Sequence, residues 1–318
     1  MWRRASARYP RLPALKRRLT GATLGVSRLL VRGRPGAGRE DLGLDPANFV
    51  WIFCVGRSGS TWLSAMMGEM ENHRVWFEPR VSQLFGQFYA NTPKPKRESA
   101  DFIMGDPVKE GWVSSIRHFV LVGARYAFPR LDSEDYLVIK EPGGGAGAPL
   151  ISEALPESRL ILLVRDPRDV VASFLDAARK GSWSQRNGLV EDEAPDGEGG
   201  ADTVVKSSAR KCLRNLTQAR EAFEAHEGPK TLVRYEDLRA DTLGTMRRVY
   251  SELAIPVDDK QLVRAVEKHA WERLPEGVKG QGKFYRKGKP GGWRDDLTPA
   301  QARTIEKITA PILQEFYA

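Results

Sequence analysis

The sequence predicts an α/β fold of three layers, in which helices cover both faces of a central parallel sheet. The first observation is a set of short apolar runs typical of buried strands, at 49–55, 75–77, 136–140, 159–164 and 231–235. The second is a set of helical patterns between and after these runs, at 60–70, 167–180, 203–226, 241–254, 258–270 and 299–316. Strands that alternate with helices favour a parallel sheet, because parallel neighbours need a crossover connection.

The first strand run ends in a turn that is suited to holding an anion. Residues 49–55 are apolar, and the chain then reads Gly56-Arg57-Ser58-Gly59-Ser60-Thr61 before a Met-rich helical segment. Glycines allow close approach to an anion, and the first N–H groups of a helix point at it. The loop of nucleoside triphosphate enzymes needs Lys before its Ser or Thr, and no such Lys is present. The alternative is an ordinary strand-turn-helix corner.

A second strand run ends in a similar way. Residues 159–164 lead into Arg165-Asp166-Pro167, where Asp suits the N-cap and Pro the first position of a helix. Arg165 thus sits at the carboxyl end of a strand, and Ser173 lies about two turns into the helix. Parallel sheets bind ligands at this edge. Two such ends with Arg and hydroxyl groups suggest a ligand with two separated anionic groups.

The net charge of +9 arises at the N-terminal end of the 318-residue chain. Residues 1–39 hold 11 of the 50 Lys and Arg and no Asp or Glu, which leaves 39 basic against 41 acidic residues elsewhere. We therefore expect a basic extension over 1–40 and a near-neutral domain over 41–318. Apolar positions between Leu15 and Leu30 approximate one helical face, which would suit contact with an anionic membrane surface. A disordered arm and a helix packed on the domain are the alternatives. No recognition motif supports a nucleic-acid partner.

Cysteine usage and hydropathy favour a cytoplasmic location, with the extension offering peripheral contact with a membrane. The two cysteines, Cys54 and Cys212, form no disulfide framework. The longest uncharged run, 81–93, has 13 residues, whereas a spanning helix needs about 20 apolar residues. Residues 184–202 contain six acids and almost nothing apolar, so we expect a mobile loop there. That loop either lies near an acceptor entrance or is a solvated insertion.

Four motifs in order make the chain resemble a sulfotransferase that uses 3′-phosphoadenosine 5′-phosphosulfate (PAPS). The motifs are the 56–62 turn, the Arg165…Ser173 pair, Val233-Arg234-Tyr235-Glu236-Asp237-Leu238, and Tyr285-Arg286-Lys287-Gly288 with the residues up to Trp293. The resemblance implies a P-loop-like three-layer fold. Gly292 departs from the pattern, since many relatives have Asp before the Trp. Arg57, where cytosolic small-molecule members carry Lys, favours the carbohydrate and protein-tyrosine type.

The resemblance also implies the residues that bind PAPS. The 5′-phosphosulfate would be held by Arg57, Ser58, Gly59, Ser60, Thr61 and Trp62, and the 3′-phosphate by Arg165 and Ser173. Arg286, Lys287 and Gly288 would close over the donor, and Trp62 and Trp271 would hold the adenine, although core packing is an equal alternative for Trp271. Arg57 would also neutralise the leaving phosphate oxygen. No metal is required, because cations can stabilise the transferring group.

Glu78 is the first candidate for the base that accepts the acceptor's proton. It follows the short strand 75–77, 21 residues after Arg57, where carbohydrate and tyrosylprotein members place a catalytic Glu. The alternative is a Glu that caps a helix or pairs with Arg80. Lys140 would contact the transferring sulfuryl group, and Glu141 is the reserve base. The histidines are expected to be structural or exposed: His73, His118, His226 and His269.

These residues predict an enzyme that transfers a sulfuryl group from PAPS to a hydroxyl acceptor. A sugar or glycolipid is the first acceptor to expect, and a phenol or other small natural product is the second. A P-loop kinase is the enzymatic alternative, and the missing Gly-Lys-[Ser/Thr] counts against it. A non-catalytic, membrane-associated scaffold is the other alternative, and retention of Glu78 and both phosphate motifs counts against that.

Overall fold

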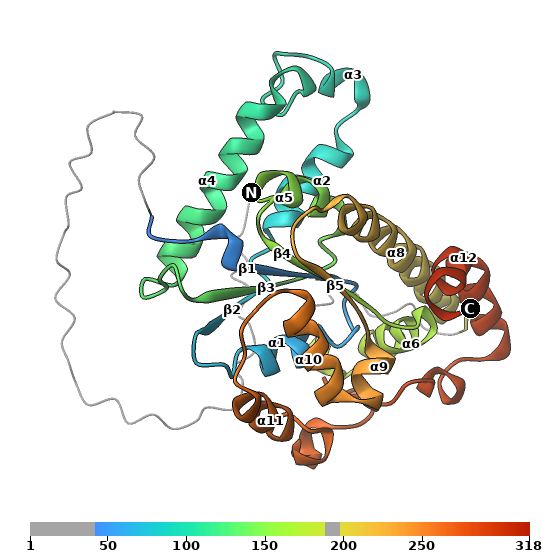
Figure 1. Cartoon of the computed structure of the whole chain (residues 1–318). Helices are drawn as coiled ribbons and strands as arrows, with labels where there is room; N and C mark the ends of the chain where they lie inside the picture. Colours follow the sequence, from blue (N-terminus) through green and yellow to red (C-terminus); the bar gives the residue numbers. More distant parts are fainter. Residues whose placement is uncertain (1–41, 188–197) are drawn as a thin grey trace, which may run out of the picture.

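The computed structural model describes residues 42–187 and 198–318 and confirms the predicted α/β fold (Figure 1). Its centre is a five-stranded parallel sheet in the order β2-β3-β1-β4-β5. The strands are β1 Phe49–Cys54, β2 His73–Phe77, β3 Tyr136–Pro142, β4 Arg159–Val164 and β5 Lys230–Arg234. Each overlaps a predicted apolar run, because a parallel sheet covered on both faces buries nearly every residue of its central strands.

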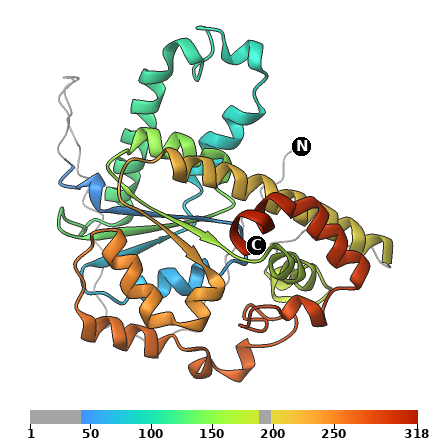
Figure 2. The same cartoon turned by 45° about the vertical axis from the view of Figure 1, so that its right-hand side comes forward.

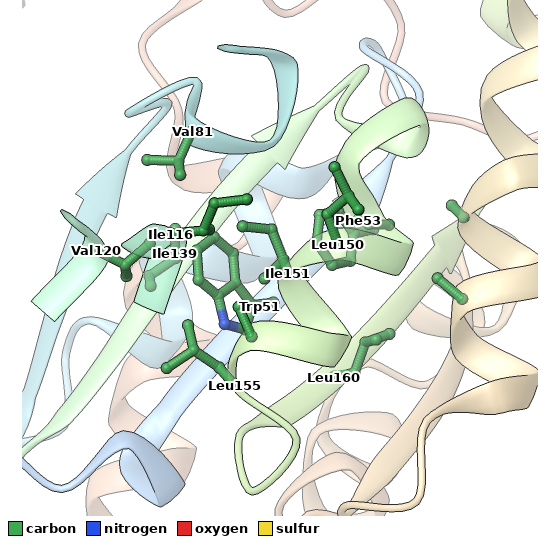
Figure 3. Close-up of a cluster of buried hydrophobic side chains, with 14 of the residues drawn as sticks. Trp51, Phe53, Val81, Ile116, Val120, Ile139, Leu150, Ile151, Leu155 and Leu160 are labelled. Carbon is green, nitrogen blue, oxygen red and sulfur yellow. The ribbon is translucent and has the colours of Figure 1, made fainter. Parts of the chain in front are cut away.

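Two hydrophobic clusters form the core, one on each face of the sheet. Successive side chains of a strand point to opposite faces. In β1, Trp51 and Phe53 therefore enter one cluster while Val50 and Ile52 enter the other. Figure 3 shows the first cluster, where Trp51 lies among aliphatic side chains. Those labelled near it are Ile116, Ile139, Ile151 and Leu155.

The helices form the two outer layers. α2, α4, α5 and α8 supply the first cluster, α1, α10 and α11 supply the second, and α6 and α12 pack with α8 at the side of the sheet (Figure 2). The helices are α1 Ser60–Met67, α2 Val81–Asn91, α3 Lys94–Arg97, α4 Lys109–Ala127, α5 Ala148–Ala154, α6 Pro167–Ala177, α7 Trp183–Arg186, α8 Glu198–Ala225, α9 Tyr235–Ala240, α10 Thr242–Glu252, α11 Asp259–Lys268 and α12 Pro299–Tyr317.

Two segments differ from the sequence prediction. Residues 81–127 form α2, α3 and α4 between β2 and β3, where no helix was predicted. The loop predicted over 184–202 was wrong at its ends, because α7 extends to Arg186 and α8 begins at Glu198. The remainder of that loop, 188–197, and the predicted basic extension, 1–40, lie outside the described residues.

Neither cysteine is paired, and both are buried. Burial raises the pKa of the Cys54 thiol to about 11, so this thiol stays protonated. In the part of the chain that the structure describes, no helix is long and apolar enough to cross a membrane.

Candidate active site

A pocket opens at the carboxyl edge of the sheet, where the chain leaves β1, β2, β3 and β4. Every residue predicted to bind or react lines this pocket except Ser58 and the reserve base Glu141. Ser58 is buried just behind the turn, and its hydroxyl has no hydrogen-bond partner among the described residues. The parallel register produces this convergence, since the ends of neighbouring strands meet at one edge.

The turn after β1 has a backbone that only particular residues tolerate. Gly59 has φ of +93°, and a Cβ there would lie 2.6 Å from the Tyr235 ring. Arg57 has φ of 72°, which is uncommon for a residue other than glycine. The turn delivers Ser60 and Thr61 as the first residues of α1, where N–H groups have no partner within the helix, and both residues line the pocket. Backbone and hydroxyl donors are therefore gathered where an anion could bind.

Arg165 lies at the end of β4, directly beside this turn. Its Nη1 donates to the carbonyl oxygen of Arg57 at 2.9 Å, and its guanidinium lies 4.2 Å from the centre of the Tyr235 ring. The Asp169 carboxylate is 3.8 Å away. The Arg165 Nε is buried and has no hydrogen-bond partner among the described residues. An anion bound in the pocket could accept from that donor.

The Arg57 side chain reaches from the turn to α6. Its Nε donates to the Ser173 hydroxyl at 3.0 Å, and its Nη2 donates to the Phe284 carbonyl at 2.6 Å. The guanidinium lies 5.1 Å from the Trp183 ring centre and 4.9 Å from that of Phe284. Burial, together with Arg165 and Arg286 nearby, lowers the pKa of Arg57 to about 10. From the sequence, Arg57 was predicted to neutralise the leaving phosphate oxygen. In the structure its guanidinium donates instead to Ser173, one of the two residues predicted to hold the 3′-phosphate.

Glu78, Lys140 and Thr61 form a connected polar group at the opposite end of the pocket. The Lys140 Nζ lies 2.6 Å from Glu78 Oε1 and 3.1 Å from Thr61 Oγ1. It also lies 3.6 Å from the centre of the Phe77 ring. Lys140 is buried, whereas the Glu78 side chain keeps 29% of its exposure. The carboxylate can therefore meet an incoming molecule, and the ammonium links it to the anion-binding turn.

Glu141 has a different environment from Glu78. It is 1% exposed and does not line the pocket. Its carboxylate accepts from the Val81 N–H at 2.8 Å and from the Ser82 hydroxyl at 2.5 Å, so it holds the first turn of α2. Burial raises the pKa of Glu141. These contacts support a structural part for Glu141.

The loop that follows residue 278 is fastened to α6 by two carboxylates. Asp176 accepts from the Gly282 N–H at 2.9 Å. Asp169 is fully buried and accepts from the N–H groups of Gly291 at 2.7 Å and Trp293 at 2.9 Å. The helix that carries Ser173 therefore also holds the loop that was predicted to close over the donor.

Within that loop, Arg286 and Gly288 occupy defined positions. Arg286 is buried and forms an ion pair with Asp296. Gly288 has φ of +61°, and a Cβ there would lie 2.2 Å from the Trp271 ring. Only glycine allows this contact, which sets the loop directly on Trp271. Both Trp271 and Gly288 line the pocket.

Several lining residues were not predicted as site residues. They are Pro142, Trp183, Tyr235, Arg239, His269, Leu274, Phe284 and Tyr285. Tyr235 and Tyr285 lie within quoted motifs, and Phe284 directly precedes one, so proximity to a motif was the available signal. His269 accepts the Trp62 indole N–H at its carbonyl, while its ring Nε2 lies 2.9 Å from Glu69. Its imidazole therefore already has a partner.

The lining is strongly cationic. Among its described residues the cations are Arg57, Lys140, Arg165, Arg239, Arg286 and Lys287, and the carboxylate is Glu78. Such a pocket suits a ligand with several negative charges. Within residues 42–187 and 198–318, no cluster of three or more His, Cys, Asp or Glu is placed to hold a metal ion.

Comparison with known proteins identifies the class to which this fold and pocket belong. Residues 50–259 match the profile of the sulfotransferase family, and the chain therefore belongs to that family. A search of curated proteins finds no match.

Two solved structures share the fold. Mouse sulfotransferase SULT7A1, complexed with PAP, is 14% identical, with a TM-score of 0.53 over 87% of this chain and 92% of that one. Sulfotransferase STF9 from Mycobacterium avium is also 14% identical, with a TM-score of 0.54 over 87% of this chain and 78% of that one. The resemblance seen in the sequence is thus confirmed at the level of family and fold.

Proposed function

We propose that this protein transfers the sulfuryl group of PAPS to a hydroxyl group of an acceptor. The observation that carries the proposal is the pocket itself, which is lined by six cations and one carboxylate and holds two groups of donors, the turn after β1 and the Arg165–Ser173 pair. PAPS has negative charge at both ends of its ribose, so its two charged ends match those two groups. The solved structure of the mouse relative contains PAP, the product that PAPS leaves.

The residues present fit PAPS. The turn after β1 and the start of α1 would hold the 5′-phosphosulfate, and Arg165 with Ser173 would hold the 3′-phosphate. The unpartnered Arg165 Nε is a donor that such an anion would satisfy. Trp271, packed against Gly288, and Trp62 offer aromatic faces for the adenine.

The geometry at Glu78 supports general-base catalysis. When bound, PAPS supplies the sulfuryl group and a phosphate leaving group. Glu78 would take the proton of the acceptor hydroxyl as that oxygen attacks sulfur. Lys140, which touches both Glu78 and Thr61, would stabilise the negative charge of the transferring group. Arg57 would neutralise charge from the nucleotide side, and the proposal needs no metal.

For the acceptor we propose a sugar or glycolipid first and a phenol or other small natural product second. A kinase is disfavoured because no Lys precedes Ser60 or Thr61. A non-catalytic scaffold would have no need of the Glu78–Lys140 pair. We further propose a cytoplasmic location, with residues 1–40 as the candidate contact with a membrane surface.

Arg165→Ala tests the donor assignment. Losing a charge-assisted hydrogen bond costs about 1.5–3 kcal/mol, so the dissociation constant of PAP should rise about 10–150-fold in calorimetry. Ser173→Ala should have a smaller effect. The control is Arg247→Ala, at an exposed arginine of α10 that pairs with Asp259, and it should bind PAP normally. Unchanged PAP affinity in folded Arg165→Ala, or turnover of ATP instead of PAPS, would contradict the proposal.

A further inference from the structure

The exposed hydrophobic residues gather in one part of the molecule. Among the described residues, the large hydrophobic side chains with high exposure are Phe77, Leu84, Phe88, Ile103, Val108, Phe119 and Tyr126. Phe77 ends β2, and the other six lie on α2 through α4, an arm between β2 and β3 that projects from the sheet in Figures 1 and 2. Concentrated apolar exposure of this kind marks an interaction site.

On the arm, these side chains fall on adjoining helix faces. Leu84 and Phe88 are four residues apart on α2, so they share a face. Val108 directly precedes α4. Phe119 lies eleven residues after Val108, about three helical turns, so these two side chains also share a side of the helix. The Phe85 and Phe119 rings are 5.4 Å apart and join the two helices. We call Leu84, Phe88, Ile103, Val108 and Phe119 the arm face.

The arm follows directly after Glu78, the candidate base, in the chain. Phe77, 54% exposed, directly precedes Glu78 and lies under the Lys140 ammonium. On α2, Gln83 donates from Nε2 to the carbonyl of Pro142 at 3.1 Å, and Pro142 lines the pocket. Leu84, 57% exposed, is the next residue. Exposed apolar side chains therefore lie on the two elements that flank Glu78 in the chain, at the end of β2 and in the first turn of α2.

Charge at the end of the arm is balanced. Residues 94–110 contain four basic residues, Lys94, Lys96, Arg97 and Lys109, and four acidic ones, Glu98, Asp101, Asp106 and Glu110. An anionic surface would gain little electrostatic attraction here. A molecule that binds the arm face would therefore be recognised by apolar contact and not by charge, with a single reactive polar group placed at Glu78.

We propose that the arm face binds the apolar chain of the acceptor, which is a lipid that carries a hydroxyl group. This inference rests on the proposed function and narrows its acceptor class. The hydroxyl lies at Glu78 and Lys140, and the hydrocarbon extends past Phe77 and Leu84 toward Phe88. Each CH₂ group that is fully buried strengthens binding about fourfold, so affinity should rise with chain length.

Linear alcohols of four and twelve carbons, butanol and dodecanol, are the probes. Binding of labelled dodecanol to the full chain loaded with PAP is measured by equilibrium dialysis, and PAP binding is measured separately by calorimetry. Wild type should bind dodecanol at least tenfold more tightly than butanol. The double variant Leu84→Ser, Phe88→Ser should lose at least tenfold in dodecanol affinity, and both positions are exposed enough to keep the fold. The control is Gln87→Ser, an exposed position of the same helix.

The outcomes separate this inference from the proposed function. Failure of wild type to bind PAP overturns the donor assignment, while dodecanol binding still decides the arm face. Equal dodecanol affinity in wild type and the double variant overturns the inference, as does no preference for dodecanol over butanol. If dodecanol does not bind, two other measurements would reassign the arm face. Adsorption of wild type to phosphatidylcholine vesicles that the double variant abolishes would assign it to a bilayer. Self-association in sedimentation that the double variant abolishes would assign it to a second copy of the chain.

Discussion

Replacing Glu78 with Gln tests the chemical step most directly. Gln has the same shape and keeps an oxygen that can accept from Lys140, whose Nζ now lies 2.6 Å from Glu78 Oε1. The buried ammonium thus retains a partner, and the fold should survive. The side chain can no longer take a proton from an acceptor hydroxyl, so only the base is removed.

The expected loss follows from that role. General-base catalysis contributes about 10²–10⁴-fold to a rate, which corresponds to about 3–5.5 kcal/mol of activation free energy. The kcat should fall by this factor. PAP affinity should stay within about twofold of wild type, because Glu78 lies at the far end of the pocket from Arg165 and Ser173.

Single-turnover transfer from labelled PAPS, combined with PAP calorimetry, separates chemistry from binding. Glu141→Gln is the matched control, since its carboxylate holds Val81 and Ser82 at the start of α2 and does not line the pocket. It should lower the free energy of unfolding while the folded protein keeps a near-normal rate. A normal rate in Glu78→Gln with a large loss in Glu141→Gln would refute our assignment. Normal rates in both would indicate an acidic acceptor such as a phenol.

Three further outcomes follow from the described contacts. Asp169→Ala should raise the KM for PAPS with little change in kcat at saturation, because Gly291 and Trp293 lose their acceptor and Arg165 loses a nearby carboxylate. The exposed Asp259→Ala, away from the pocket, is the control, and equal KM values in Asp169→Ala and wild type would contradict the reasoning. Arg57→Lys keeps the charge but loses the planar donor set, so PAP should bind about tenfold or more weakly; wild-type affinity would show that charge alone suffices. Burial lowers the pKa of His73 to about 4, below the value of about 6.5 in the unfolded chain, so the unfolded state binds the extra proton between these pH values. Stability should therefore fall by about 2–3 kcal/mol from pH 7 to pH 4.5 in urea titrations, and His73→Phe should remove that part of the loss.

The strands could be predicted from the sequence because their signal is local. β1 and β4 are continuous apolar runs, and burial on both faces selects such runs. The sequence predicted β2 only from Val75 onward, although the strand begins at His73. The polar ring of His73 is buried because it stacks on Tyr136 of the neighbouring strand, a contact that local hydropathy does not reveal. The same limit hid α2, whose core-facing residues alternate with exposed apolar ones.

The candidate site was predictable where it is built from the ends of strands. Arg165 and Lys140 each terminate an apolar run, so parallel packing alone brings them to one edge. The direction of the Arg57 side chain was not predictable, because it depends on Trp183 and Phe284, which are 126 and 227 positions away in the chain. The contacts of Asp169 with Gly291 and Trp293 were likewise not predictable, because they join positions more than 120 residues apart, although both partners lie within the last motif.

The order of strands separates the residues proposed to bind the nucleotide from the arm. The residues proposed to contact the nucleotide come from the segments after β1 and β4 and from the C-terminal loop, whereas residues 81–127 leave the sheet after β2 and return at β3. None of these described residues lines the nucleotide pocket. The exposed surface of the arm can therefore vary without a change in the pocket lining, while its buried residues remain part of the core. Grafting that exposed surface from a relative with another acceptor should transfer acceptor preference, while the recipient's own grip on the nucleotide carries over intact.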